Sequence, residues 1–169
     1  MSRSVAGDLL KDLGDLHYGR KRIQPASREI RTFYNKARDR LQYPVLTFER
    51  EHVSTIACGF ANQIARSAYM CYACAIMPDH VHILIRKHRD SAEMMLANLQ
   101  RTSHLALRES GIVDVEHPVW GGPGWKVFLD TPDDIRRTVH YIEQNPVKIR
   151  LPLQKWDFVK EYDGWPFHK

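Results

Sequence analysis

The sequence predicts an α+β domain in which an antiparallel hairpin packs against amphipathic helices. Two short apolar runs, residues 71–77 and 80–86, are separated only by Pro78 and Asp79, a pattern typical of a β-hairpin with a tight turn. Apolar residues recur at helical spacing on either side of this hairpin. With 169 residues, of which 43% are hydrophobic, the chain can bury a proper core, and we expect residues 1–169 to form a single domain.

The helices are expected both before and after the hairpin. Residues 27–42 and 49–69 show helical spacing of apolar side chains, and the second of these stretches leads into the first strand. Ser91 is a suitable N-cap for a third helix that runs to about residue 109. Residues 120–129 contain a Gly-Gly-Pro-Gly turn and are expected to end in a short strand, 126–129.

The last helix has clear start and stop signals. Thr131 is a natural N-cap, and Pro132 suits the first helical position. Pro146 is expected to end the helix, because the residue before a proline disfavours helical geometry. In a helix between these points, Tyr141 lies beside the apolar stripe, and Asn145 lies one turn further along the same side.

The positive charge of the chain is concentrated towards its N-terminus. The formal net charge is +5, and residues 1–42 form a basic segment, irregular at first and helical towards its end, with aromatic residues among the cations. Such a segment favours a phosphate backbone and unstacked bases, although a solvated helix face is the simpler interpretation of charge alone. The candidate nucleic-acid-binding residues are Arg20, Lys21, Arg22, Arg31, Lys36 and Arg38.

Nothing in the composition indicates a membrane or an oxidising compartment. No apolar run reaches membrane-spanning length, and the first residues lack the hydrophobic stretch of a secretory signal. The three cysteines, an odd number, do not suggest a disulfide framework. We therefore expect a cytoplasmic protein with no membrane partner.

The second strand of the hairpin opens with two histidines. Residues two apart in a strand share a face, so His80 and His82 are expected to project together while Val81 faces the other way. Two adjacent imidazoles can bind one divalent metal ion. The simpler interpretation of an isolated His-x-His is two polar residues at a strand edge. Here a metal would explain why polar residues open an otherwise apolar strand.

A structural zinc site that combines these histidines with Cys71 and Cys74 is a weaker alternative. Side chains three apart in a regular strand face opposite ways, so both thiols could not reach one ion without a local distortion of the strand. The sequence has no glycine at this point to favour such a distortion. We therefore do not expect the cysteines to bind metal.

Two separated blocks of sequence resemble the single-tyrosine HUH transposases, and especially the REP-associated tyrosine transposase branch. The first block is AIMPDHVHILI, in which His80-Val81-His82 is the His-hydrophobic-His motif, and the second is HYIEQNPVKIRLP, residues 140–152. VWGGPGWKVFLDTPDDIRR precedes the second block, and the resemblance extends from about residue 69 to the C-terminus. It implies a ferredoxin-like antiparallel sheet with the histidine strand at its centre and the tyrosine helix packed on it.

The resemblance also implies an activity and its residues. Tyr141 would be the nucleophile that cuts single-stranded or hairpin DNA through a 5′-phosphotyrosine intermediate, as a metal-dependent endonuclease and strand transferase in DNA transposition. His80 and His82 would bind Mg²⁺ or Mn²⁺, with Asn145 as third ligand and Gln144 as a less favoured substitute. A homodimer is one expected arrangement of the chain, in which the tyrosine helix serves either the histidines of its own protomer or those of the partner. The alternative is a relative that binds nucleic acid without catalysis.

One part of the sequence departs from the family pattern. Relatives usually begin with a β-strand that lies in the middle of the sheet, whereas no apolar or alternating run of that kind precedes residue 27. Residues 44–48 could form a short strand, but they follow the basic segment. We therefore expect that the chain lacks the usual first strand or forms it from another segment, which bears directly on catalytic competence.

Overall fold

The computed structural model describes residues 43, 46–121, 124 and 126–166. The predicted helix 27–42 and the six candidate nucleic-acid-binding residues of the basic segment lie outside these ranges. Within them the protein has an α+β fold, as the sequence predicts. None of the described helices is long and apolar enough to cross a lipid bilayer.

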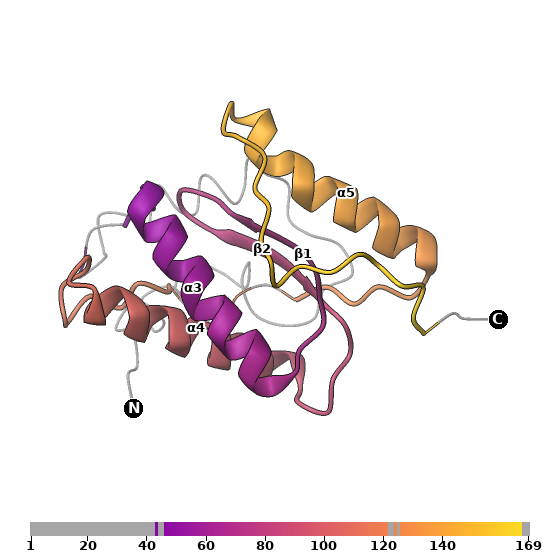
Figure 1. The fold of residues 1–169 in the computed structure, drawn as a ribbon, viewed down its shortest axis with the longest axis horizontal. Helices are drawn as coiled ribbons and strands as arrows, with labels where there is room; N and C mark the ends of the chain where they lie inside the picture. The colour runs from indigo at the N-terminus through magenta and orange to yellow at the C-terminus, as the bar shows by residue number, and fades with distance from the viewer. Residues whose placement is uncertain (1–42, 44–45, 122–123, 125, 167–169) are drawn as a thin grey trace, which may run out of the picture.

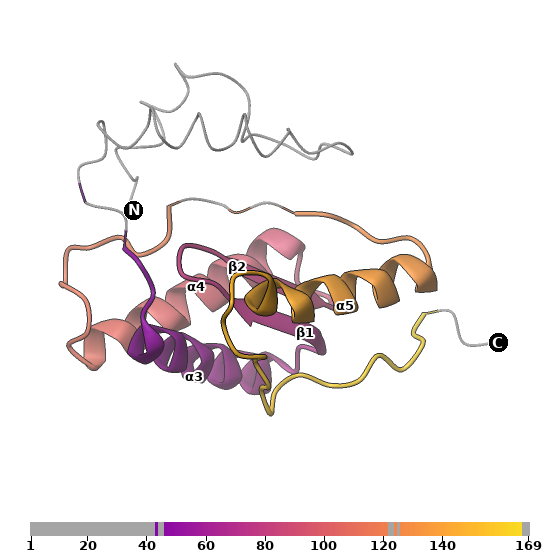
Figure 2. The ribbon, with the colours of Figure 1, turned by 90° about the horizontal axis from the view of Figure 1, so that it is seen from above.

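In the described ranges, three helices enclose a two-stranded antiparallel sheet. In chain order the elements are α3 (Arg50–Ser67), β1 (Cys71–Ile76), β2 (Val81–Ile85), α4 (Ala92–Glu109) and α5 (Pro132–Lys148). Figures 1 and 2 show α3 and α4 side by side below one face of the sheet, and α5 across the opposite face. The hairpin is thus the middle layer between a helix pair and a single helix.

The predicted N-caps begin two of these helices. The Ser91 hydroxyl accepts a hydrogen bond from the Met94 backbone N–H, and the Thr131 hydroxyl accepts one from that of Asp134. The helix pair approaches closely at Gly59, where a Cβ atom would lie 2.6 Å from the Ser103 Cα. A glycine at this crossing therefore lets the backbones of α3 and α4 come together and bury the main apolar cluster.

A β-bulge near the start of β1 decides which side chains face which layer. The pairing of β1 with β2 shifts in register between Cys71 and Ala73, so that Tyr72 is the extra residue. After the bulge, alternate side chains divide cleanly between two clusters. The cluster towards α3 and α4 contains Cys71, Cys74, Ile76, Ile56, Phe60, Leu99 and Leu107, and that towards α5 contains Ala73, Ala75, Met77 and Ile142.

The C-terminal segment runs along the free edge of β1. The Gln154 side chain makes two hydrogen bonds of 2.8 Å to the backbone of Ile76, one as acceptor and one as donor. Further along, the backbone N–H of Lys160 donates to the Cys71 carbonyl, and Val159 forms a parallel bridge with Cys71. Irregular chain therefore satisfies an edge that another strand would otherwise cover.

The rest of the predicted sheet is only partly seen. In the described ranges β2 pairs with β1 alone, so the central position of the histidine strand and the ferredoxin-like topology stay predictions. Residues 126–129 were expected to form a strand, and this is wrong: they are irregular, with Val127 59% exposed and so without the burial that favours a strand. Residues 46–48 are also irregular, and the Phe48 N–H donates to the Pro78 carbonyl.

Candidate metal and tyrosine site

The two histidines lie together at the start of β2. Their Nε2 atoms are 3.0 Å apart, and the rings are perpendicular. His82 pairs across the sheet with Ala75, whose side chain belongs to the cluster under α5. The expected placement is therefore confirmed: both imidazoles project from the sheet face that the tyrosine helix covers, which follows from the two-residue period of a strand.

Asp79 fixes the orientation of His80. Its Oδ1 lies 2.6 Å from the His80 Nδ1. A carboxylate only accepts hydrogen bonds, so Nδ1 carries the hydrogen, and the Nε2 lone pair of His80 faces the His82 Nε2 at 3.0 Å. The sequence suggests Asp79 only as a turn residue after Pro78, and this second role was missed. A carboxylate beside a candidate metal-binding histidine was the signal that could have revealed it.

His82 is held as a neutral ring. Burial lowers the pKa of His82 to about 4, and the charges of His80 and Lys148 act in the same direction. At physiological pH the ring therefore carries no charge, which is the form that binds a metal ion. The two histidines together offer two ring nitrogens on one side of the sheet.

Tyr141 stands over this pair from α5. Its ring centroid is 5.6 Å from that of His82, and its side chain is 49% exposed, so solvent or a substrate can reach it. Lys148, seven residues later on the same helix face, places its Nζ 4.4 Å from the centroid of the Tyr141 ring. The helical repeat thus brings a hydroxyl and an ammonium group to the histidines.

Asn145 occupies the same helix face, one turn after Tyr141. It is 8% exposed, and its side-chain Nδ2 has no hydrogen-bond partner among the described residues. A buried amide without a partner is costly, about 1–3 kcal/mol, and such groups are uncommon in folded proteins. Asn145 stands at the helix position where the resemblance implies a third metal ligand, for which the amide would use its Oδ1 oxygen and not the unpaired Nδ2.

The helix that carries these residues does not end where Pro146 predicts. It continues to Lys148, with Pro146 fully buried inside it. Proline removes one backbone N–H and strains the preceding turn, and the burial of its ring offsets this cost. The prediction is therefore corrected, and the two added residues matter because they bring Lys148 back over Tyr141.

The arrangement of donor atoms fits a divalent ion. Two ligands that each lie about 2.1 Å from an octahedral ion are about 3.0 Å apart when adjacent, and the two histidine Nε2 atoms have this spacing of 3.0 Å. An amide oxygen from Asn145 would suit Mg²⁺ or Mn²⁺. In the described part of the chain, no group of three or more His, Cys, Asp or Glu side chains is arranged to hold a metal.

The cysteines belong to a different layer. Cys71 and Cys74 share one face of β1, contrary to the expectation from regular alternation, because the bulge at Tyr72 shifts the strand by one residue. That face points to α3 and α4, whereas His80 and His82 lie on the α5 face. The two cysteines and the two histidines therefore lie on opposite faces of the sheet and cannot bind one zinc ion together.

Comparison of the chain with models of known protein families, with curated proteins and with solved structures finds no match. The functional assignment therefore depends on the geometry of the site and on the resemblance of its two sequence blocks.

Proposed function

We propose that this protein is a metal-dependent endonuclease and strand transferase for single-stranded DNA, in which Tyr141 is the nucleophile. The observation that supports this most strongly is that strand β2 and helix α5, far apart in sequence, bring two histidines and an accessible tyrosine together, with ring centroids of His82 and Tyr141 5.6 Å apart. The two elements are also those whose sequences resemble the single-tyrosine HUH transposases.

The chemistry is a balanced exchange of phosphate esters. The Tyr141 oxygen attacks the phosphorus of the scissile phosphodiester, forming one P–O bond as the bond to the 3′-oxygen breaks. The tyrosine proton passes to solvent, and the departing 3′-oxygen takes up a proton as a hydroxyl. A 3′-hydroxyl of a second strand can reverse these steps and rejoin the DNA, so no ATP is required for strand transfer in transposition.

Each protein group has a defined part in this exchange. His80, His82 and Asn145 would hold Mg²⁺ or Mn²⁺, which supplies positive charge opposite the phosphate oxygens when bound. Asp79 orients His80 through the 2.6 Å hydrogen bond. Lys148, beside the Tyr141 ring, adds a fixed cation where negative charge accumulates on the transferred phosphate.

The test is formation of a covalent protein–DNA adduct. The protein is incubated with Mn²⁺ and pooled single-stranded hairpin DNAs, and the products are separated on a denaturing gel. Tyr141→Phe should bind DNA like the parent and form no adduct, and His80→Ala should lose both the adduct and bound Mn²⁺. Tyr162→Phe is the matched control, because the buried Tyr162 hydroxyl has no hydrogen-bond partner in the described part of the chain.

The outcomes separate the candidate functions. A full 5′-linked adduct in Tyr141→Phe would show that another residue is the nucleophile. Salt-dependent DNA binding by the parent without any adduct would favour the non-catalytic nucleic-acid-binding relative. Because Tyr141 and His82 of one chain are already in contact, we expect the site to act within one protomer. A homodimer that exchanges its tyrosine helices would instead recover adduct when the Tyr141→Phe and His80→Ala variants are mixed.

A further inference from the structure

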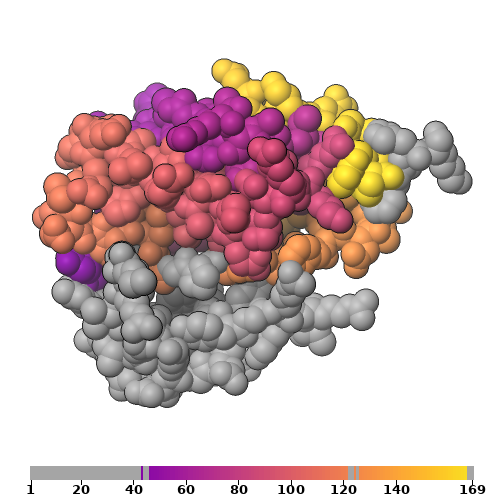
Figure 3. Space-filling model, turned by 90° about the horizontal axis from the view of Figure 1, so that it is seen from below, coloured from indigo at the N-terminus to yellow at the C-terminus, as the bar shows by residue number. Residues whose placement is uncertain are grey.

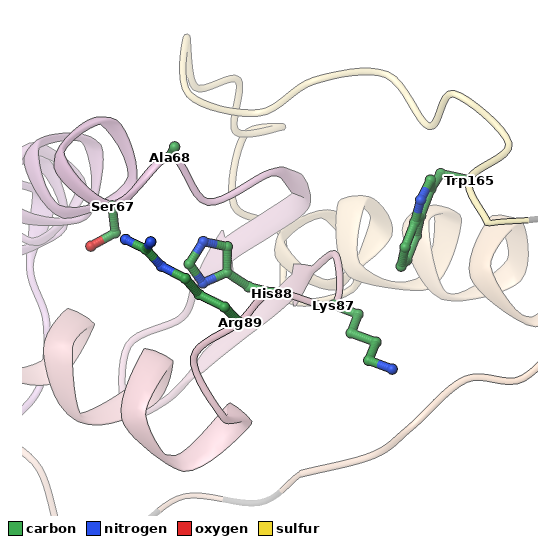
Figure 4. A pocket seen from close by; sticks show the side chains of 6 residues that line it. All are labelled: Ser67, Ala68, Lys87, His88, Arg89 and Trp165. Carbon is green, nitrogen blue, oxygen red and sulfur yellow. The ribbon is translucent and has the colours of Figure 1, made fainter.

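A groove lies at the opposite end of β2 from the histidines. It has a volume of about 660 Å³ and opens between the end of α3, the loop after β2 and the C-terminal segment. In Figure 3 the surface of the C-terminal residues adjoins that of the loop after β2, and Figure 4 shows the side chains from close by. The lining residues are Ser67, Ala68, Lys87, His88, Arg89 and Trp165.

Two cations of this groove have no partner among the described residues. Lys87 and Arg89 lie on either side of His88 in the loop after β2, and neither forms an ion pair or hydrogen bond with any described residue. Other loop charges nearby are paired, such as Arg86, whose guanidinium lies 3.5 Å from the Asp163 carboxylate. The groove therefore carries two positive charges available to an external anion.

His88 adds a ring N–H donor between these cations. The backbone N–H of Asp90 donates to the His88 Nδ1 at 3.1 Å, so Nδ1 is unprotonated and the ring hydrogen lies on Nε2. The edge of the ring meets Tyr69 with centroids 4.9 Å apart, and the Tyr69 hydroxyl donates to Asp90 at 2.7 Å. This network holds the floor of the groove in one arrangement.

Trp165 forms an aromatic wall that is also held in place. The Arg86 guanidinium lies 4.1 Å from the centroid of the Trp165 ring, and the Trp165 backbone N–H donates to Asp163 at 3.0 Å. In Figure 4 the indole stands across the groove from His88, with Lys87 between them. A rigid aromatic ring beside free cations suits a ligand that combines anionic groups with flat rings.

We propose that this groove binds single-stranded nucleic acid, with a phosphate between Lys87 and Arg89 and an adjoining base against Trp165. Sites for unpaired strands combine a positively charged groove that follows the phosphates with aromatic side chains on which the bases stack. The groove lies one five-residue strand, roughly 17 Å, from the histidines. That the groove holds the nucleotides flanking the cleaved bond rests on the proposed function. That it binds single-stranded nucleic acid does not depend on that function.

The first experiment removes the two cations from the full-length chain. Binding of a fluorescent oligothymidylate is measured by anisotropy across a salt series in EDTA, so that no covalent step occurs. For Lys87→Ala/Arg89→Ala, the dependence of log affinity on log salt should become shallower by about 0.7, because the contact to the phosphate between the two cations is lost. The control Arg50→Ala/Lys155→Ala removes the same charge from exposed positions elsewhere, and an identical slope in both double variants would overturn the proposal.

The second experiment tests the aromatic wall. Trp165→Leu should weaken oligothymidylate binding about 5- to 100-fold but leave binding of an abasic strand of equal length unchanged, because only a base can stack on the ring. Equal loss on both strands, or loss on neither, would overturn the role of Trp165. The same measurement with oligouridylate distinguishes DNA from RNA as the ligand. Whichever of the two strands binds more tightly identifies the nucleic acid for which the groove is suited. Failure of the Tyr141 adduct assay with these results intact would overturn the proposed function alone.

Discussion

Asp79→Ala provides a sharp test of the metal site, because it changes a residue that would not touch the metal. The carboxylate accepts the His80 Nδ1–H at 2.6 Å. Without it, the imidazole can rotate and can place its hydrogen on Nε2, which then no longer offers a lone pair beside the His82 Nε2. We therefore expect Asp79→Ala to weaken metal binding while all proposed ligands are still present.

Asp79→Ala should change metal affinity much more than it changes the free energy of unfolding. Loss of a hydrogen-bond partner of a metal-binding histidine lowers metal affinity about 10- to 100-fold, which corresponds to about 1.4–2.7 kcal/mol. The side chains of His80 and Asp79 are 50% and 68% exposed, so their ion pair adds little to folding. The free energy of unfolding should accordingly change by no more than about 0.5 kcal/mol.

The assay is Mn²⁺ titration followed by calorimetry, with urea unfolding measured in parallel. Asp133→Ala is the control, since it removes an exposed carboxylate from a surface pair with Arg136 at 2.9 Å and should leave Mn²⁺ affinity unchanged. Asp79→Asn keeps an acceptor oxygen without the charge and should fall between the two. Unchanged Mn²⁺ affinity in Asp79→Ala would refute the reasoning, and adduct formation should recover at saturating Mn²⁺ if it is correct.

Three further predictions concern buried groups. Cys58 is exposed, whereas burial raises the pKa of Cys71 to about 12 and that of Cys74 well above its usual value. In the folded protein one thiol per chain should therefore react with a disulfide reagent at pH 8, and all three should react in urea. Because only the unfolded chain ionises Cys71 between about pH 9 and 12, and the raised pKa of Cys74 acts in the same direction, stability should be complete below pH 9 and fall as pH rises through this window. Asn145→Leu should raise the free energy of unfolding by about 1 kcal/mol, since it removes a buried amide without a partner, while abolishing the adduct. Asn98→Leu, which removes a donor to the Tyr69 hydroxyl, should instead destabilise the protein.

Local sequence rules were sufficient for the hairpin, for the start of two helices and for the convergence of the histidines. The hydroxyls of Ser91 and Thr131 cap their helices as their residue types predict. The two-residue period of a strand was enough to place His80 and His82 on one face. These features depend on near neighbours in the chain, so a pattern can reveal them.

The features that the sequence did not reveal depend on packing between distant segments. No glycine in the sequence indicates the bulge at Tyr72, yet the bulge determines that the cysteines face away from the histidines. Pro146 stays helical only because its ring is buried by the rest of the fold. The contact of Lys148 with Tyr141 follows from helical spacing alone, but only after the helix is known to pass the proline.

The division of the hairpin into two faces explains how an exposed chemical site can coexist with a stable core. Towards α3 and α4 the hairpin presents large apolar side chains, and these form the main cluster. Towards α5 it presents Ala73 and Ala75, and Ala75 is the cross-strand partner of His82. Small side chains there leave room for an imidazole beside the helix and let α5 come near enough for Tyr141 to reach it. Because burial of the other face supplies most of the hydrophobic stabilisation, the α5 face can carry polar groups without loss of the main core.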